Sequence, residues 1–344
     1  DVCVARLMDY SRWNFNVSCC KEAIMGMRIA EVSCMVIATI LTVIFILVLI
    51  RTKLLHANLR ALFLATTITD FLIMYSRIFD LLHTDGLIVD HIIVLVTKYT
   101  GWMLDCLLLF LILVERYYAI KHNETYDEIS MNCPIRIIVY ILVILFGTGT
   151  LAILAATGIY PRTIYIFGLL IVALLVFMSY FISLPINSTM IKRLEAKKFT
   201  LNQTNYVNGR FQAHESRRSQ LMLKYYIPFQ VGTLLTILAT ATGLTLFIVP
   251  THPTYFLLIQ QSTYFLFVPR AIISMLIALQ LHPSLRRRTK QMFSWRTPKG
   301  SEQEESRSTA AVHVAVKSLS GKQLNFESAR QRDLYFEGYA NEWK

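Results

Sequence analysis

Three ionisable residues, Asp70, Asp105 and Arg270, lie deep inside long apolar segments of the sequence. Toward the ends that carry most Lys and Arg, Asp105 lies eleven residues from Arg116, Asp70 lies twelve from Asn58, and Arg270 lies twelve from His282. At about 1.5 Å per residue, all three would lie roughly 17–18 Å from the same end of a helix bundle. A charge in the middle of a bilayer costs about 2.5–3.5 kcal/mol, so such residues usually face the bundle interior and pair. We therefore expect one buried polar cluster, acting either as a static ion pair or as part of a switch.

A second set of polar residues lies nearer the other end of these segments. Lys98 stands about two helical turns from the expected cluster, and Trp102 lies one turn closer to it, while Gln261 and Tyr264 lie on the last apolar segment. A lysine at this depth suits an anionic or carbonyl-bearing ligand held between helices. These four residues are therefore candidate ligand-binding residues. The alternatives are that Lys98 reaches outward to water or pairs with Asp80, and that Trp102 only packs.

The elements that would position these residues are seven apolar segments. Of the 344 residues, 55% are hydrophobic and 16% are charged, and the mean hydropathy is +0.48. A soluble protein has about 25% charged residues, and a helix needs about 20 mostly apolar residues to cross a bilayer. The sequence therefore predicts an all-α membrane protein with a seven-transmembrane helix bundle. The predicted segments are Val32–Ile50, Ala61–Leu82, Ile92–Val114, Ile137–Pro161, Thr163–Ile191, about 222–249 and about 255–281.

The distribution of Lys and Arg predicts which way the segments run. The loops after the first, third, fifth and seventh segments hold 20 of these residues, and the opposite side holds 5. Basic loops are cytoplasmic, so we expect the N-terminus outside and the C-terminus inside. The net charge of +12 therefore reflects topology and contact with membrane lipids, and no nucleic-acid partner is expected. With only 13 Gly, 9 Pro and 6 Cys, the composition also excludes a collagen, a disordered linker and a disulfide-rich secreted domain.

This orientation makes predictions about the outer N-terminal stretch. Asn16 begins a glycosylation sequon there, whereas the sequons at Asn123, Asn187 and Asn202 fall on the cytoplasmic side and should be silent. The stretch also contains three cysteines, which allow one disulfide bridge whose pairing stays open: Cys3, Cys19 and Cys20. No signal peptide is recognisable, and the sequence opens on Asp1 as a processed or truncated chain would.

The predicted organisation has four parts: an extracellular N-terminal tail (1–30), a seven-transmembrane bundle (31–281), an amphipathic juxtamembrane helix (282–299) and a cytoplasmic tail (300–344). In the third part an apolar stripe runs beside basic residues, which is typical of a helix lying on the inner leaflet. A solvated basic linker is the alternative. The stripe consists of Leu285, Thr289, Met292 and Phe293.

The third segment ends in Glu115-Arg116-Tyr117. An arginine at a cytoplasmic helix end can hydrogen-bond the neighbouring carboxylate in a resting state and then be released to meet a partner. Basic residues before the sixth segment would extend the cationic face that receives such a partner, unless they form a solvated loop near anionic lipid. These residues are Arg210, Arg217 and Arg218.

Longer stretches accompany this motif, namely Leu55–Arg60, Tyr126–Glu128, Arg210–Glu215, His282–Arg286 and Leu334–Phe336. Together they resemble the nematode serpentine chemoreceptors of the Sra superfamily, and most closely the class epsilon (Sre) branch, which are seven-transmembrane G-protein-coupled receptors. The resemblance implies a GPCR-like fold and a chemosensory function. It further implies a small extracellular ligand bound between the helices, a heterotrimeric G protein as partner, and a place in the plasma membrane of sensory neurons and their cilia.

The sequence departs from rhodopsin-like receptors. The short second outer loop has no Cys, the seventh segment has no Asn-Pro-x-x-Tyr motif, and the absence of Lys from that segment excludes a retinal Schiff base. A seven-helix ligand-gated channel and a transporter are the alternative functions, although no internal repeat supports a transporter. We expect no enzyme, metal or cofactor, because the segments offer no His cluster and no Cys-x-x-Cys pair, and the two buried aspartates have an arginine nearby.

Overall fold

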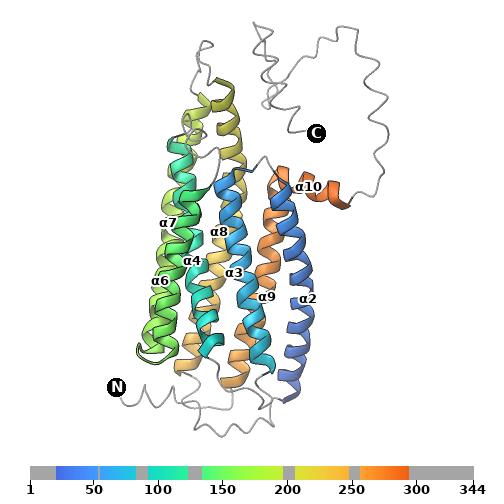
Figure 1. Cartoon of the computed structure of the whole chain (residues 1–344), viewed down its shortest axis with the longest axis vertical. Coiled ribbons are helices and arrows are strands. Elements are labelled where there is room, and N and C mark those ends of the chain that lie inside the picture. Colours follow the sequence, from blue (N-terminus) through green and yellow to red (C-terminus); the bar gives the residue numbers. More distant parts are fainter. Residues whose placement is uncertain are drawn as a thin grey trace. The chain divides into compact units, whose positions relative to one another are not determined.

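The computed structural model describes residues 21–52, 55–82, 92–122, 134–196, 206–247 and 256–293. All the regular structure in these ranges is helical. The helices are α2 (Lys21–Arg51), α3 (Ala57–Leu82), α4 (Ile92–Lys121), α6 (Ile135–Ala156), α7 (Arg162–Ala196), α8 (Tyr206–Phe247), α9 (Phe256–Leu281) and α10 (Pro283–Phe293). The first seven run alongside one another as a bundle, alternating in direction along the chain (Figure 1).

The bundle is that of a membrane protein of the seven-transmembrane type. Six of the described helices, all except α4 and α10, are long and apolar enough to cross a bilayer. Large apolar side chains are exposed on α2, α6 and α7. Phe146 on α6, for example, is 79% exposed. An apolar surface on helices long enough to cross a bilayer is typical of a face that contacts lipid. The seventh long helix, α4, has 30 residues and is the one most enclosed by the others.

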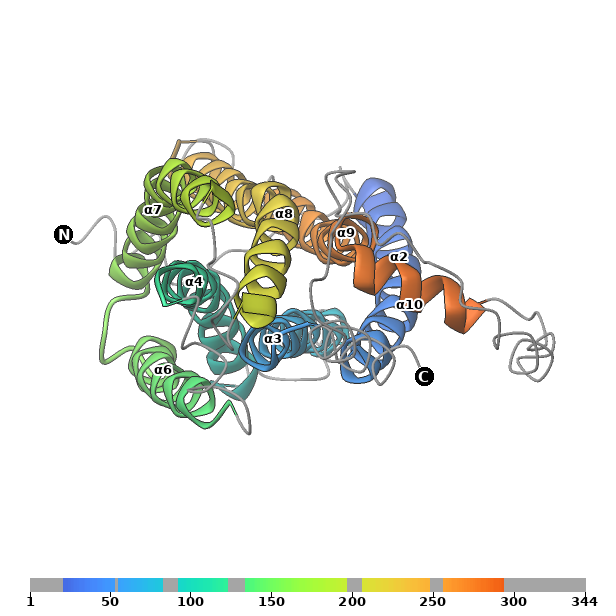
Figure 2. The same cartoon turned by 90° about the horizontal axis from the view of Figure 1, so that it is seen from above.

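Helix α4 lies among α3, α6, α7 and α8 and packs against all four of them, which form one group (Figure 2). In the other group, α2 packs against α3 and α9, and α9 also packs against α8. Helix α3 therefore joins the two groups, because it contacts α2 and α9 as well as α4. Residues that face inward from α3, α4 and α9 are consequently brought toward one another.

Polar residues inside these helices are accommodated by local hydrogen bonds. The hydroxyls of Thr66, Thr67 and Thr69 on α3 donate to the carbonyls four residues earlier, at 2.7–2.9 Å. Such bonds satisfy a hydroxyl that would otherwise be costly in an apolar environment. Helix α6 ends where Gly158 adopts a φ of 78°, a left-handed conformation that glycine takes without strain.

Seven long helices are found where seven apolar segments were predicted, and most differ by being longer. Helix α2 begins at Lys21, well before the predicted start at Val32, so residues 21–30 are its first turns, although the sequence analysis placed them in a tail. Helix α8 begins at Tyr206, where the prediction began at about 222. A hydropathy pattern locates the apolar centre of a span, whereas helices continue into the polar boundary of the membrane. The three N-terminal cysteines lie outside the described residues, and Cys34 and Cys106 are free thiols.

Candidate functional site

Polar residues recur at a two-turn spacing on two neighbouring helices. Asp70 and Arg77 are seven residues apart on α3, and Lys98 and Asp105 are seven residues apart on α4. Seven residues is about two turns, so each pair lies on one face of its helix, separated along the axis by about 10 Å. The two pairs, together with residues of α2, α8 and α9, form two polar layers in the bundle.

The inner polar layer consists of Asp70, Asp105, Gln230 and Arg270, from four different helices. One guanidinium nitrogen of Arg270, Nη2, donates to Asp105 Oδ2, and Nη1 lies 3.5 Å from Asp70 Oδ1. The third, Nε, donates to the backbone carbonyl of Gln230 at 3.1 Å. The Gln230 amide also donates to Asp70 Oδ2 at 3.5 Å. The structure therefore brings together the three charged residues that the sequence analysis grouped, and adds an uncharged fourth.

The inner polar layer is almost closed to solvent and incompletely satisfied. Asp105 and Gln230 are fully buried, and Asp70 and Arg270 are less than 10% exposed. Within the described part of the chain, Asp105 Oδ1 and Gln230 Oε1 have no hydrogen-bond partner. The layer therefore has more acceptors and more negative charge than Arg270 alone can satisfy.

The outer polar layer consists of Glu31, Arg77, Lys98 and Gln261, from α2, α3, α4 and α9. Arg77 Nε donates to Glu31 Oε1 at 3.0 Å, and Arg77 Nη2 donates to Gln261 Oε1 at 2.6 Å. Gln261 Nε2 then donates to Glu31 Oε2 at 2.5 Å, which closes a ring of three side chains. Lys98 is buried and lies close enough to Arg77 and Glu31 to interact with both electrostatically.

The outer polar layer lies near one end of the bundle. Arg77 is five residues from the end of α3, Lys98 is six residues from the start of α4, and Gln261 is five residues from the start of α9. Because α3 runs opposite to α4 and α9, these three positions belong to the same end (Figure 1). The predicted topology makes this the extracellular end.

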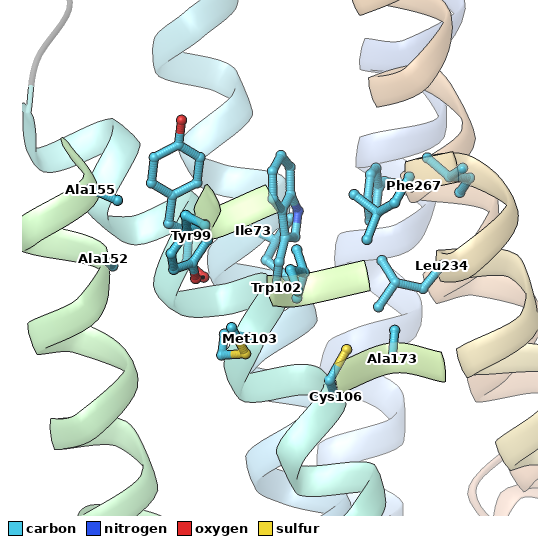
Figure 3. Packing of buried hydrophobic residues seen from close by; sticks show 14 residues of the cluster. Ile73, Tyr99, Trp102, Met103, Cys106, Ala152, Ala155, Ala173, Leu234 and Phe267 are labelled. Carbon is cyan, nitrogen blue, oxygen red and sulfur yellow. Dashed lines mark hydrogen bonds between the residues drawn. The ribbon is translucent and has the colours of Figure 1, made fainter. Parts of the chain in front are cut away.

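Aromatic side chains fill the space between the two polar layers. Trp102 stacks on Phe267 of α9, with ring centroids 5.6 Å apart and an interplanar angle of 11° (Figure 3). The ring centroids of Tyr99 and Tyr165 lie 5.0 Å apart, and the Tyr165 hydroxyl donates to the backbone carbonyl of Tyr99 at 2.7 Å. Trp102 is 7% exposed, so it packs in the hydrophobic core between α4 and α9. We name the stacked rings of Trp102 and Phe267 the aromatic floor of the outer polar layer.

At the other end of α4, Glu115 and Arg116 form a two-point ion pair. Arg116 Nε and Nη2 donate to the two carboxylate oxygens of Glu115 at 2.5 and 2.6 Å, and both residues are buried. Arg116 lines a small pocket between α4, α7 and α8 with a cavity volume of about 20 Å³. Asn187 is also part of the lining, and its Oδ1 has no hydrogen-bond partner among the described residues.

The other predicted site residues are placed as follows. Tyr117 is 40% exposed, Arg217 is exposed and Arg218 is partly buried on α8. The side chains of Arg210 and Tyr264, and the whole of Asn16, lie outside the described residues.

Sequence reasoning missed Glu31 and Gln230 and assigned no role to Arg77. Glu31 directly precedes the charge-free stretch that starts at Val32, so it lay just outside the predicted first span. Gln230 carries no charge, so an analysis of charges in apolar segments does not find it. An amide inside a long stretch without Lys, Arg, Asp or Glu is the signal that could have identified it.

The family model of the Sre G protein-coupled chemoreceptors matches residues 94–344 of the chain. The matched region includes Lys98, Asp105, the Glu115–Arg116 pair and Arg270, while α2 and α3 precede it. No curated protein matches the chain.

Proposed function

Because the chain belongs to the Sre G protein-coupled chemoreceptors, we propose that it binds a small extracellular ligand between its helices and activates a heterotrimeric G protein inside the cell. A receptor of this kind transmits a conformational change and catalyses no reaction. Its place would be the plasma membrane of sensory neurons and their cilia, as the family's chemosensory role suggests.

The observation that carries this proposal is the Glu115–Arg116 pair beside the pocket at the inner end of α4. A guanidinium held by two hydrogen bonds to the adjacent carboxylate is restrained, and a shift of α7 or α8 would change the pocket that Arg116 lines. The basic residues Arg217 and Arg218 on α8, with Arg210 earlier in the same helix, would give the partner a cationic approach.

The proposed ligand site is the outer polar layer together with its aromatic floor. Lys98 and Gln261 supply polar groups there, Trp102 supplies an aromatic surface, and Tyr264 lies three residues after Gln261 on α9. A few polar groups on an apolar wall are the usual composition of a small-molecule site.

Helices α4 and α9 are suited to carry the signal between the two ends. Each contributes one residue to the outer polar layer and one to the inner polar layer, and Trp102 of α4 stacks on Phe267 of α9 between them. Pro269, next to Arg270, removes one backbone hydrogen bond from α9 at the depth of the inner polar layer. A helix with a missing bond bends there more readily than elsewhere.

The test is a small-molecule screen in cells with a second-messenger readout for the G protein, repeated with Arg116→Ala. We expect responses of the wild-type chain to disappear in Arg116→Ala while the amount at the cell surface is retained. Lys121→Ala, an exposed cation on the last turn of the same helix, is the matched control and should leave the response unchanged. A response that persists in Arg116→Ala as a fast ionic current would instead identify a ligand-gated channel.

The proposed orientation has its own test. Glycan attachment at Asn16, removed by Asn16→Gln, is expected if the N-terminus is outside. A glycan at Asn202 with none at Asn16 would invert the topology and with it the assignment of the ligand and G-protein ends.

A further inference from the structure

Helix α8 is interrupted near its middle by Pro228. Proline has no backbone N–H, so the carbonyl of Lys224, four residues earlier, lacks the donor that any other residue at position 228 would supply. A carbonyl freed in this way weakens the helix at that turn unless another donor reaches it. Pro228 therefore marks the turn at which α8 bends more readily than elsewhere.

Helix α7, which packs against α8, supplies a donor at this turn. The Tyr180 hydroxyl donates to the backbone carbonyl of Lys224 at 2.8 Å, and the tyrosine is buried. One turn away on both helices, the side-chain amide of Gln220 donates to the carbonyl of Leu184 at 3.4 Å. Two side-chain contacts thus join α7 and α8, and the shorter one falls on the carbonyl that Pro228 leaves free.

Both contacts lie at the pocket that Arg116 lines. The four residues that make them all belong to the pocket lining, and every α8 residue of the lining precedes Pro228. The cavity volume of about 20 Å³ has room for about one water molecule and is too small for a segment of a protein partner. The pocket must therefore widen before a partner enters, and a bend of α8 at Pro228 would move one of its walls.

We propose that the Tyr180 hydroxyl restrains α8 at Pro228, by replacing the missing N–H, and so keeps the inner pocket closed in the resting receptor. This inference rests on the proposed receptor function and names a positioning residue for it. Loss of the hydrogen bond leaves the Lys224 carbonyl without a protein donor, which favours a bent α8 in which water reaches that carbonyl. The bent form has the wider pocket, and a partner that enters the pocket selects that form.

The restraint is tested by a double-mutant cycle of Tyr180→Phe and Pro228→Ala in the full-length chain in lipid nanodiscs. Tyr180→Phe removes the hydroxyl and keeps the ring, whereas Pro228→Ala gives α8 its own N–H for the Lys224 carbonyl. The measurement is the amide hydrogen exchange of residues 216–227, followed by mass spectrometry. Tyr180→Phe alone should speed this exchange about fivefold, the effect of losing one hydrogen bond, and should change it little when Pro228→Ala is also present.

The consequence for signalling is measured in cells that express the same set of chains. Ligand-independent second-messenger signalling, corrected for the amount at the cell surface, should rise severalfold in Tyr180→Phe and return to the wild-type level in the double variant. Tyr140→Phe removes the hydroxyl of a tyrosine that is 54% exposed on α6. It is the matched control and should leave both exchange and signalling unchanged.

A purely structural role of Tyr180 predicts a different result, because a loss of ring packing would have the same effect with Pro or Ala at position 228. An equal effect of Tyr180→Phe in both backgrounds, or unchanged exchange in Tyr180→Phe, therefore overturns the proposal. Faster exchange without a rise in basal signalling, in a chain that still responds to ligand, overturns the part that concerns the closed pocket.

Hydrogen exchange involves no G protein, so the restraint and the receptor function fail separately. The expected exchange in all variants, with no second-messenger response from any chain to any ligand, would support the restraint and count against the receptor function. A loss of G-protein coupling in Arg116→Ala together with an unchanged exchange in Tyr180→Phe would do the opposite.

Discussion

The outer and inner polar layers are built on the same three helices, α3, α4 and α9, yet they hold charge differently. In the outer polar layer, Glu31, Arg77 and Gln261 form a closed ring in which both carboxylate oxygens accept a hydrogen bond. In the inner polar layer a single guanidinium serves two carboxylates and a backbone carbonyl, and Asp105 Oδ1 is left without a partner within the described ranges.

This difference suggests a division of labour between the two layers. The outer polar layer holds its carboxylate in a closed ring beside two cations, whereas the inner polar layer has, among the described residues, two carboxylates that both depend on Arg270. A buried charge that loses its partner is costly, so the inner polar layer should govern stability. The variants below test this comparison.

The largest effect is expected from Arg270→Met. It removes the one cation that the structure describes in contact with Asp70 and Asp105, and leaves two buried carboxylates without a counter-charge. Breaking a buried pair in this way costs about 3–5 kcal/mol, so little of the variant should reach the cell surface. The matched variant is Arg77→Met, which should lose less because Lys98 remains near Glu31. Equal losses, measured as surface amount and unfolding temperature, would remove the distinction between the layers.

A smaller effect should distinguish the two aspartates of the inner polar layer. Asp105 is fully buried and makes the closest contact with Arg270, whereas Asp70 lies 3.5 Å from both its partners. Asp105→Asn should therefore lower the unfolding free energy by about 1.5–3 kcal/mol, the value of a hydrogen bond to a charged group. Asp70→Asn removes the excess negative charge and should cost much less. The reverse order in thermal unfolding would mean that Asp70 is the main partner of Arg270.

The inner polar layer was accessible to prediction because its charges stand out in apolar segments. Asp70, Asp105 and Arg270 lie at a common depth, and depth follows from the rise per residue of a helix. Gln230 was missed because an amide leaves no mark in a charge pattern. Its contact with Asp70 depends on the rotation of α8 about its axis, which the charge-free, mostly apolar part of α8 after Lys224 does not specify.

The outer polar layer was predicted only in part, for a different reason. Lys98 and Gln261 were identified as candidates, but their neighbours Glu31 and Arg77 were not joined to them. Glu31 belongs to the layer because α2 continues outward beyond Val32, and the position at which a helix ends in the membrane boundary is set by packing and local polarity rather than by the apolar stretch. The closed ring is therefore a tertiary feature.

The next effect concerns the spacing between the layers. Gly101 lies between Lys98 and Asp105 on α4, and a Cβ at this position would stand 2.5 Å from Cγ1 of Ile73 on α3. Gly101→Ala should therefore force α3 and α4 apart and lower the unfolding free energy by about 1–3 kcal/mol. Gly168→Ala on α7, where no neighbouring atom lies within 4 Å of the added Cβ, is the control and should be neutral or slightly stabilising. Equal unfolding temperatures for the two variants would show that the layers tolerate a change of helix spacing.

The smallest change in stability, and the most informative one for signalling, is expected at the inner end of α4. Glu115 and Arg116 are neighbours in one helix, so their two mutual hydrogen bonds do not join separate helices as those of the layers do. Glu115→Gln keeps the shape of the side chain and removes its charge. It should weaken the hydrogen bonds that restrain Arg116 by about 1 kcal/mol, which shifts the equilibrium between the restrained and released states about fivefold.

Ligand-independent second-messenger signalling should therefore rise severalfold in Glu115→Gln, while the unfolding temperature changes little. Lys121→Ala, at an exposed position on the last turn of the same helix, is the control and should leave both quantities unchanged. A variant that signals at the wild-type basal level would show that Arg116 is not restrained by Glu115. The resting state would then have to be maintained at the inner polar layer, where Arg270 of α9 pairs with Asp105 of α4.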